Sequence, residues 1–203
     1  MISVLKSGGF FIIPIIICGF LATFIIIERI YYFISLKKKD TKFVKDLEEH
    51  LFSNDYEKCL NDCFIAQTPT SLSVKKAIES RRYAENDLRE VVESEMTLNV
   101  PQFERFITPL GTIANIATLL GLLGTVTGNM KAFNVLGNGG TMGDPALLAS
   151  AIAEALVTTV AGLCVSIPSL IFHNYFVSKV KSKIAEMEAY VTTVILKIEG
   201  RVK

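Results

Sequence analysis

Three stretches of this chain are nearly free of charged residues and are long enough to cross a lipid bilayer. Residues 8–36 contain only two charged residues, both in their last third. Residues 107–136 contain one, Lys131, and residues 155–176 contain no Asp, Glu, Lys or Arg. A helix needs about 20 mostly apolar residues to span a membrane. The pattern therefore predicts transmembrane helices over residues 9–36, 107–136 and 151–177.

Small and hydroxyl-bearing residues recur every three or four positions in the second and third of these stretches. On an α-helix this spacing places them on one face. A soluble core would fill such a face with Leu and Ile, whereas membrane helices use small residues to approach one another closely. We therefore expect two helices that turn small, weakly polar faces toward each other or toward a central element. The two stripes are Gly111, Ala114, Thr118, Gly121, Thr125, Gly128 and Ala132, and then Ala155, Thr159, Gly162, Ser166, Ser169 and His173.

The segment between the first and second spans is also expected to be helical. Two short amphipathic helices are predicted over 40–51 and 55–67, with a turn at Thr-Pro-Thr before the next element. A longer helix with an apolar stripe is predicted over 71–100. Pro101 and Pro109 are expected to kink or interrupt the passage into the second span, because proline cannot donate a backbone hydrogen bond.

A turn is predicted between the second and third spans. Residues 137–140 read Gly-Asn-Gly-Gly, and Pro145 suits the first turn of the helix that follows. The third helix is expected to continue past the membrane through Lys179. The sequence thus predicts an all-α integral membrane protein with three transmembrane helices, of which the second and third extend into the cytoplasm as a hairpin.

The basic residues predict the orientation of these helices. Residues 37–105 hold 12 Lys and Arg and the tail after Phe176 holds 6, whereas residues 138–154 hold none. Basic segments flanking membrane spans stay in the cytoplasm. Glu28 and Arg29 are expected to form an interfacial charge pair at the inner end of the first span. The expected layout is a short periplasmic N-terminus (1–8), a cytoplasmic helical segment (37–106), a periplasmic turn (137–150) and a cytoplasmic C-terminal helix (178–203).

Composition narrows the class of function. The chain has 203 residues, is 50% hydrophobic and carries a net charge of +1, which gives no reason to expect a nucleic-acid partner. The sequence contains no nucleotide-binding loop, zinc-protease or serine-hydrolase signature, so an enzyme is not expected. Cys59 and Cys63 lie four residues apart without a second pair, which is a weak metal signal. We expect neither a metal site nor a cofactor.

Hydroxyl-bearing side chains in the spans suggest a path for an ion. Thr125 falls in the middle of the second span, and Thr158, Thr159 and Ser166 lie in the third. A hydroxyl both donates and accepts hydrogen bonds, so a file of hydroxyls can hold water or stabilise a carboxylate. A proton relay needs a titratable group at membrane depth, and mid-span the sequence has none. The missing carboxyl group is therefore expected to come from another polypeptide.

Other residues in the spans have two interpretations. Glu154 is either a carboxylate favoured by the positive end of a helix dipole or a charge at the pore mouth that shapes ion entry. Gly121, Gly128 and Gly162 are expected to serve helix packing rather than conduction. Pro168 is expected to kink the third span and to take part in its packing. For Thr125 and Thr159, by contrast, the functional interpretation is favoured over packing.

Two long motifs are specific enough to suggest a family. Residues 118–133 read TLLGLLGTVTGNMKAF, and residues 151–176 read AIAEALVTTVAGLCVSIPSLIFHNYF. They resemble the LLGLxGTVxGxxxxF and IxxALxTTxxGLxxAIPxxxxxNxF stretches of the MotA/TolQ/ExbB proton-channel family. Residues 8–33, which end their apolar run in Glu-Arg, also fit. The resemblance covers nearly the whole chain, and three spans are typical of the ExbB and TolQ branches.

This resemblance implies partners and a mechanism. Such proteins form a pentameric ring in the bacterial inner membrane around two copies of a single-span ExbD- or TolR-like protein, which supplies a protonatable Asp. Proton flow past that Asp is thought to rotate ring against core and to energise an outer-membrane process through a TonB- or TolA-like protein. By position, Thr125 and Thr159 match the family's pore-facing threonines, and Glu154 matches its acidic residue at the head of the third span.

Alternatives remain at this level. An ExbB-like role in TonB-dependent transport is favoured, but a TolQ-like role in the Tol-Pal envelope system fits the same residues. A non-conducting scaffold, whose small faces only pack, predicts that Thr125→Val and Thr159→Val are tolerated. Threonine hydroxyls can also coordinate Na⁺, so the choice of H⁺ rests on the resemblance.

Overall fold

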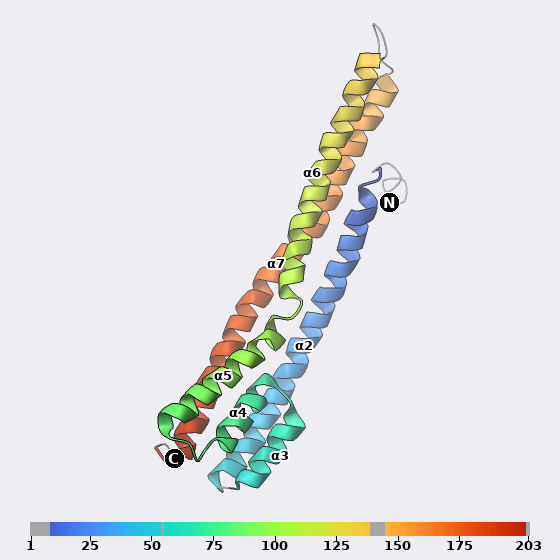
Figure 1. Cartoon of the computed structure of the whole chain (residues 1–203). Helices are drawn as coiled ribbons and strands as arrows, with labels where there is room; N and C mark the ends of the chain where they lie inside the picture. Colours follow the sequence, from blue (N-terminus) through green and yellow to red (C-terminus); the bar gives the residue numbers. More distant parts are fainter. Residues whose placement is uncertain (1–8, 54, 139–144, 202–203) are drawn as a thin grey trace. The chain divides into compact units, whose positions relative to one another are not determined.

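The structure, a computed structural model, describes residues 9–53, 55–138 and 145–201. All regular secondary structure in these ranges is α-helical (Figure 1). The predicted N-terminal segment 1–8 and residues 139–144 of the predicted turn lie outside the described residues. The helices are α2 (Ile12–Phe52), α3 (Tyr56–Ala66), α4 (Pro69–Glu79), α5 (Glu85–Glu104), α6 (Ile107–Asn138) and α7 (Pro145–Ile198).

Three helical stretches are long and apolar enough to cross a membrane, as predicted. They are Ile12–Phe52, Glu85–Gly137 and Pro145–Ile198. The last has 54 residues, and at 1.5 Å per residue it measures about 80 Å, far more than the ~30 Å core of a bilayer. Each of these stretches therefore has room both for a span and for a continuation outside the membrane.

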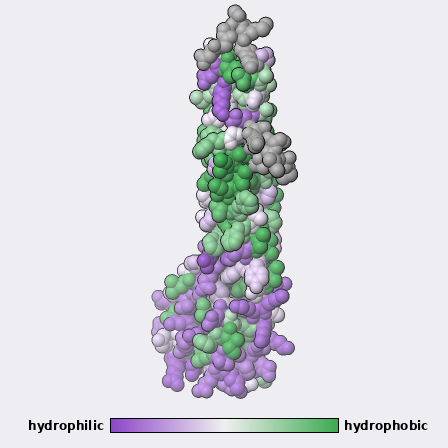
Figure 2. Space-filling view, turned by 90° about the vertical axis from the view of Figure 1, so that its right-hand side faces the viewer, coloured by the Kyte–Doolittle hydropathy of each residue, from purple (hydrophilic) through white to green (hydrophobic). Residues whose placement is uncertain are grey.

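The chain divides into two compact units, which we describe separately. The apolar unit comprises residues 9–28, 106–138 and 145–175 of the described chain, and the polar unit comprises 29–105 and 176–201. Hydrophobic side chains gather over the apolar unit in Figure 2, and hydrophilic side chains cover most of the polar unit. Both α2 and α7 contribute residues to each unit.

The apolar unit buries small residues and exposes large ones. Ala114, Ala117 and Ala155 are buried, whereas Phe20 is 75% exposed and Leu119 is 63% exposed. Water would penalise such a surface, but lipid tails are as apolar as these side chains. The start of α2 packs against α7, since a Cβ on Gly19 would lie 3.2 Å from a Val165 methyl group. This distribution is that expected of helices surrounded by lipid or by further membrane helices.

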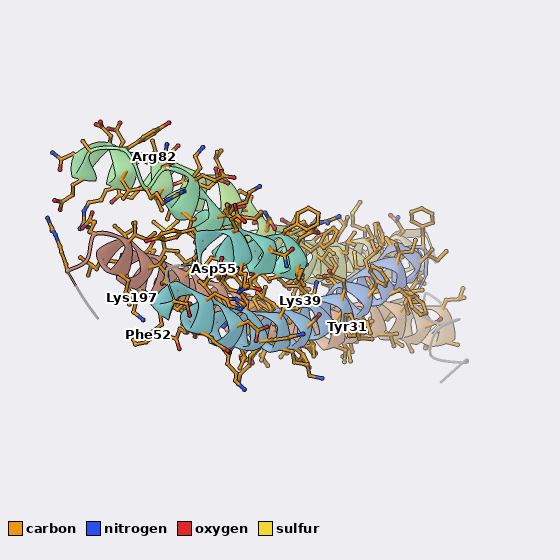
Figure 3. All side chains as sticks on the ribbon, turned by 90° about the horizontal axis from the view of Figure 1, so that it is seen from below. Tyr31, Lys39, Phe52, Asp55, Arg82 and Lys197 are labelled. Carbon is orange, nitrogen blue, oxygen red and sulfur yellow. The ribbon has the colours of Figure 1, made fainter. Side chains whose placement is uncertain are left out.

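The polar unit has the opposite, conventional distribution. Phe33 of α2 stacks on Phe176 of α7 with ring centroids 6.0 Å apart. The Ser73 hydroxyl of α4 lies 3.8 Å from the Met187 sulfur of α7. Figure 3 shows the many charged side chains around this unit and labels Phe52, the last residue of α2. A hydrophobic core within a charged shell is what a segment in water requires.

Two helix starts in the polar unit are set by local capping. The Asp55 side chain accepts a hydrogen bond from the Lys58 amide at the start of α3. At α4, the Thr68 hydroxyl accepts from the Ser71 amide at 3.2 Å and the Ser71 hydroxyl accepts from the Thr68 amide at 2.9 Å. This reciprocal capping box, with Pro69 in the first turn, places the chain turn at the predicted Thr-Pro-Thr.

Two helices predicted in this region begin and end elsewhere in the structure. The predicted helix 40–51 is not separate, because α2 runs without a break to Phe52. The predicted helix 71–100 is divided, since α4 ends at Glu79 and α5 begins at Glu85. The division lets α5 fold back along α4, so that the apolar stripes of both helices are buried together. A single straight helix would have left part of that stripe in water.

The passage from α5 to α6 is interrupted between the two prolines rather than at either one. Pro101 lies within α5 and Pro109 lies within the first turn of α6. The break falls at Arg105 and Phe106, where Phe106 adopts a left-handed φ of 64°. A non-glycine residue in this conformation is uncommon and must be held by its surroundings.

Arg29 is buried inside the protein, which the sequence did not predict. Its side chain is 1% exposed, and its guanidinium donates to the Phe103 carbonyl at 3.5 Å. The guanidinium also lies 4.4 Å from the centroid of the Tyr32 ring. The last carbonyls of a helix lack intrahelical partners and favour a cation. Arg29 therefore stabilises the C-terminal end of α5.

A pocket of about 210 Å³ in the polar unit holds several polar groups, including Asp40, Lys183, Glu186 and Tyr190. One Asp40 carboxylate oxygen and the Tyr190 hydroxyl are buried without a hydrogen-bond partner among the described residues. Burial raises the pKa of Asp40 above its ordinary value, and the negative charge of Glu186 adds to this. A Thr68 hydrogen bond and the positive charge of Lys183 oppose the rise.

Asp40→Asn is expected to raise the thermal unfolding midpoint of the detergent-purified protein by about 2 °C at pH 7 to 8. The amide keeps the shape and removes a charge that burial disfavours. The folded state holds the Asp40 proton more tightly than the unfolded state. The loss of folding stability caused by the buried charge is therefore absent below the ordinary pKa of 3.8 and fully present above the raised pKa. The gain should therefore shrink as the pH falls toward 4.

The matched control is Asp46→Asn on the same helix, outside this pocket. It should leave the midpoint within about 1 °C. A lower midpoint for Asp40→Asn, or a gain that does not vary with pH, would contradict the assignment of a buried, disfavoured charge.

Candidate functional site

Helices α6 and α7 approach each other closely through their glycines. A Cβ built on Gly162 would lie 2.6 Å from the Ala117 carbonyl oxygen and 3.0 Å from the Gly121 Cα. A Cβ on Gly128 would lie 2.5 Å from the Ala155 Cβ. Any side chain at these positions would force the helices apart. The structure thus places Gly121, Gly128 and Gly162 where the two predicted small faces meet, in the arrangement of small-residue packing.

Hydroxyl groups join the two helices along this contact. The Thr125 and Thr159 hydroxyl oxygens are 3.3 Å apart, and either can be the donor. Nearer the start of α6, the Thr118 hydroxyl donates to the Ser166 hydroxyl at 2.7 Å. We call these four residues the hydroxyl seam. In an apolar surrounding, each such bond replaces hydration that lipid cannot supply.

The central pair of the seam has more than one hydrogen-bonding arrangement. The Thr125 hydroxyl can donate to the Leu122 carbonyl at 2.7 Å instead of to Thr159. The Thr159 hydroxyl can donate to the Gly121 carbonyl at 3.0 Å. Because each hydroxyl carries one proton and has several acceptors within reach, the pair can reorient without leaving a donor unsatisfied. This is the property that a hydrogen-bonded relay requires.

The predicted pathway residues differ in exposure. Thr125 and Thr159 are half-buried, but Thr158 is 2% exposed and Ser166 is 7% exposed. The Thr158 side chain fills the space left by Gly124 and donates to the Ala155 carbonyl at 2.8 Å. In the single chain, Thr158 and Ser166 therefore serve contacts within and between the two helices.

Pro168 lies within an unbroken α7, and its side chain is exposed rather than packed against α6. The packing role predicted for it has no counterpart within the described chain. His173 does pack, because its Nδ1 lies 2.9 Å from the Ile107 carbonyl oxygen. A Cβ on Gly111 would lie 2.8 Å from the His173 ring. The last member of the second stripe thus closes the contact between α7 and the start of α6.

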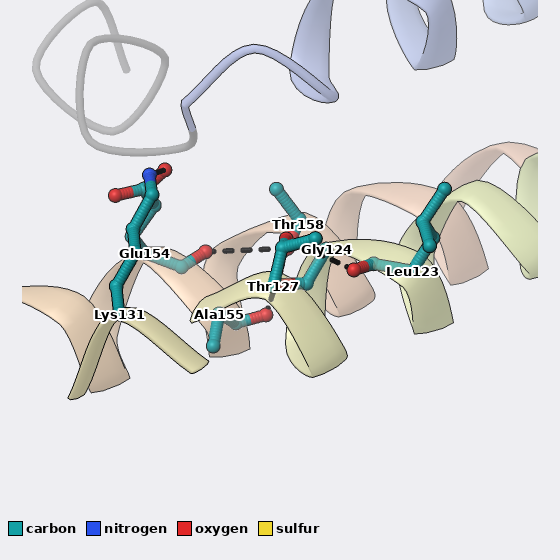
Figure 4. A network of polar contacts seen from close by, with 7 residues as sticks. All are labelled: Leu123, Gly124, Thr127, Lys131, Glu154, Ala155 and Thr158. Carbon is teal, nitrogen blue, oxygen red and sulfur yellow. Dashed lines mark hydrogen bonds and ion pairs between the residues drawn. The ribbon is translucent and has the colours of Figure 1, made fainter. Parts of the chain in front are cut away.

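Glu154 forms an ion pair that the sequence reasoning missed. Its carboxylate lies 2.7 Å from the ammonium group of Lys131, which projects from α6 (Figure 4). Figure 4 also shows Thr158 donating to the backbone carbonyl of Glu154, one turn away on α7. The signal for Lys131 was available, because it is the only charged residue in 107–136. What the sequence alone could not show is that the helix register brings the two charges together.

The two cysteines of the polar unit are neutral thiols. Burial raises the pKa of Cys59 to about 11 and that of Cys63 to about 12. No group of three potential ligands lies together anywhere in the described residues. Both cysteines are buried and act as small apolar side chains.

Long apolar helices that meet along glycines and hydroxyls are typical of a multi-pass membrane protein. Residues 65–189 match the model of the MotA/TolQ/ExbB proton channel family. The match covers more than half of the chain and includes both sides of the hydroxyl seam. The chain belongs to the MotA/TolQ/ExbB proton channel family and is ExbB-like.

Individual relatives agree with this assignment. Biopolymer transport protein ExbB-like 3 of Synechocystis sp. is 32% identical over 171 residues, which cover 84% of this chain and 81% of that protein. Biopolymer transport protein ExbB of Aquifex aeolicus is 39% identical over 80 residues, 39% of this chain and 53% of that protein. Tol-Pal system protein TolQ of Haemophilus influenzae is 35% identical over 79 residues, 39% of this chain and 34% of that protein.

Gly162→Ala is expected to destabilise the contact between α6 and α7. The new methyl group would meet backbone atoms, which cannot move aside as a side chain can, and overpacking of this kind costs about 1–3 kcal/mol. The matched control is Gly137→Ala, since a Cβ at Gly137 has no atom within 4 Å. Thermal unfolding in detergent should show a lower midpoint for the first variant only. Equal midpoints would contradict the close approach.

Proposed function

We propose that this chain is the ring subunit of a proton-motive-force-driven motor in the bacterial inner membrane. In this proposal, an ExbB-like homopentamer surrounds an ExbD-like single-span partner and energises TonB-dependent outer-membrane transport. The observation that carries the proposal is the pair of Thr125 and Thr159 hydroxyls, 3.3 Å apart and only half-buried in the single chain. Both threonines lie within residues 65–189, which match the model of the proton channel family.

The seam supplies only half of a proton pathway. Its hydroxyls bond to one another and to backbone carbonyls, and a hydroxyl does not ionise at ordinary pH. Within the described part of the apolar unit, Glu28, Lys131 and Glu154 are the charged residues, and the last two neutralise each other. A carboxyl group that exchanges protons at mid-membrane must therefore be contributed by a partner, which is the role of the ExbD-like protein here.

The proposed topology follows from charge and exposure. Lys37, Lys38 and Lys39 are exposed on α2 at the start of the polar unit, and cytoplasmic loops retain such residues. We therefore place the polar unit in the cytoplasm, with the C-terminus, and the connection between α6 and α7 in the periplasm, with the N-terminus. Large apolar residues exposed on the apolar unit would contact lipid and neighbouring subunits.

Two other functions are supported by specific observations. The similarity to a TolQ protein supports a role in the Tol-Pal system, with a TolR-like core and a TolA-like client. The glycine contacts support a scaffold that packs without conducting. The ExbB-like role is preferred because the relatives matched over most of this chain include an ExbB-like protein. Variants of Thr125 and Thr159 distinguish the scaffold from both motors.

Thr125→Val and Thr159→Val are each expected to lower proton uptake at least about tenfold while the complex still assembles. Valine has nearly the shape of threonine but cannot donate or accept a hydrogen bond, so the relay is interrupted and the packing is retained. The measurement is acidification of liposomes that contain the chain co-purified with its single-span partner, under an imposed membrane potential.

The control is Thr127→Val. Among the described residues, the Thr127 hydroxyl donates only to the Leu123 and Gly124 carbonyls of its own helix, so its loss should leave proton uptake nearly unchanged. Normal uptake in both seam variants would refute the hydroxyl-lined path and favour the scaffold.

The subunit count tests the ring directly. Native mass spectrometry of the detergent-purified chain, alone and co-expressed with its single-span partner, is expected to show five copies that capture two partner copies. A ring is expected because a central helix must be enclosed for protons to pass between it and the seam. A monomer or a one-to-one complex would remove the enclosed pathway.

A further inference from the structure

Two of the three charged residues in the described part of the apolar unit form one ion pair. Lys131 is the only charged residue in the apolar part of α6, and Glu154 is the only Asp, Glu, Lys or Arg in 145–176. Their side chains are 58% and 25% exposed, so the pair faces solvent at one end of the contact between α6 and α7. Glu154 lies five residues before Thr159, about 7.5 Å along the helix axis from the hydroxyl seam.

We propose that Lys131 determines the ion specificity of the pathway by occupying the Glu154 carboxylate and so denying it to metal cations such as Na⁺. This inference rests on the proposed conducting function and explains why the pathway carries H⁺ rather than Na⁺. The pair lies where an ion would enter, and Glu154 is the single carboxylate within reach of the seam among the described residues. Lys131 is thus a specificity-determining residue that acts through Glu154.

The two ions make different demands at such an entrance. A Na⁺ ion must exchange hydration for several oxygen ligands, and a carboxylate is the strongest ligand that this region offers. With the Lys131 ammonium 2.7 Å from the carboxylate oxygen, a second cation at that oxygen would meet a like charge a few ångströms away. A proton needs no coordination shell and moves along hydrogen-bonded water and hydroxyl groups.

The surroundings of Glu154 limit its freedom to leave this partner. Gly9, at the start of the described chain, adopts a left-handed φ of 62°, and a Cβ there would collide with the Glu154 carboxyl group. Close backbone on that side restricts the rotamers of Glu154. The Thr158 hydroxyl donates to the Glu154 carbonyl at 3.2 Å and engages the same turn of α7. The carboxylate is therefore held on the side that faces Lys131.

A purely structural role for the pair makes a different prediction. If the ion pair only fastened α6 to α7, replacing Lys131 would change stability but not the ratio of ions that cross the membrane. The ion ratio is therefore the readout that separates the two roles. Lys131→Met removes the charge and keeps an unbranched side chain, and Lys131→Arg keeps the charge.

The first experiment measures H⁺ and Na⁺ uptake separately in liposomes containing the complex with its single-span partner. A pH-sensitive and a Na⁺-sensitive dye report the two fluxes under the same imposed potential. The unaltered chain and Lys131→Arg are expected to carry H⁺ with little Na⁺. Lys131→Met should raise Na⁺ uptake about tenfold, and adding Glu154→Gln to it should abolish that rise. An unchanged ratio in Lys131→Met would overturn the inference.

A second measurement does not depend on conduction. The thermal midpoint of the detergent-purified Lys131→Met chain should rise in NaCl relative to choline chloride, because the freed carboxylate then binds Na⁺. The unaltered chain and the double variant Lys131→Met, Glu154→Gln should show no such difference. If the unaltered complex carries no protons, the proposed function fails, yet this comparison still decides whether Lys131 keeps Na⁺ from the Glu154 carboxylate. Equal midpoints in both salts for Lys131→Met would refute it.

Discussion

The close approach of α6 and α7 is the constraint on which the rest of the apolar unit depends. Lipid tails are as apolar as leucine, so membrane helices gain little from hiding large side chains and must associate through fitted backbone contact. The Gly162 position faces the Ala117 carbonyl oxygen without room for a methyl group. Only at that separation can the short hydroxyl side chains of Thr125 and Thr159 bond to each other across the contact.

The same constraint explains how the large side chains are distributed. The seam takes up the small faces of both helices, so large residues such as Leu119 must point away from it. That surface is suited to lipid and to further helices but not to water. The polar unit follows the packing of a water-soluble protein. Phe33 and Phe176 are buried against each other while charged side chains face outward. One chain thus uses two packing rules, each matched to its surroundings.

Periodicity and hydropathy predicted the parts of this fold that depend on local pattern. The three long apolar helices and both small-residue stripes are readable because a helical face repeats every three to four residues. The break between α4 and α5 and the burial of Arg29 were missed, since both depend on which distant segment lies opposite. Thr158 shows the same limit: adjacent to Thr159 in sequence, it faces Gly124 instead of an open surface. A stripe identifies a face but not its partner.

Under the proposed function, the seam lets a chain without a mid-membrane carboxyl group take part in proton transfer. The Thr125 and Thr159 hydroxyls each have a backbone carbonyl as a second acceptor, so their mutual bond can open without leaving a donor unsatisfied in an apolar medium. An approaching carboxyl group can therefore compete for these hydroxyls at little cost. A fixed carboxylate in the same place would bind its proton or counter-ion continuously. In the proposed motor, neutral and reorientable hydroxyls on this chain act together with a titrating group on a partner, so that motion of one past the other is coupled to proton transfer.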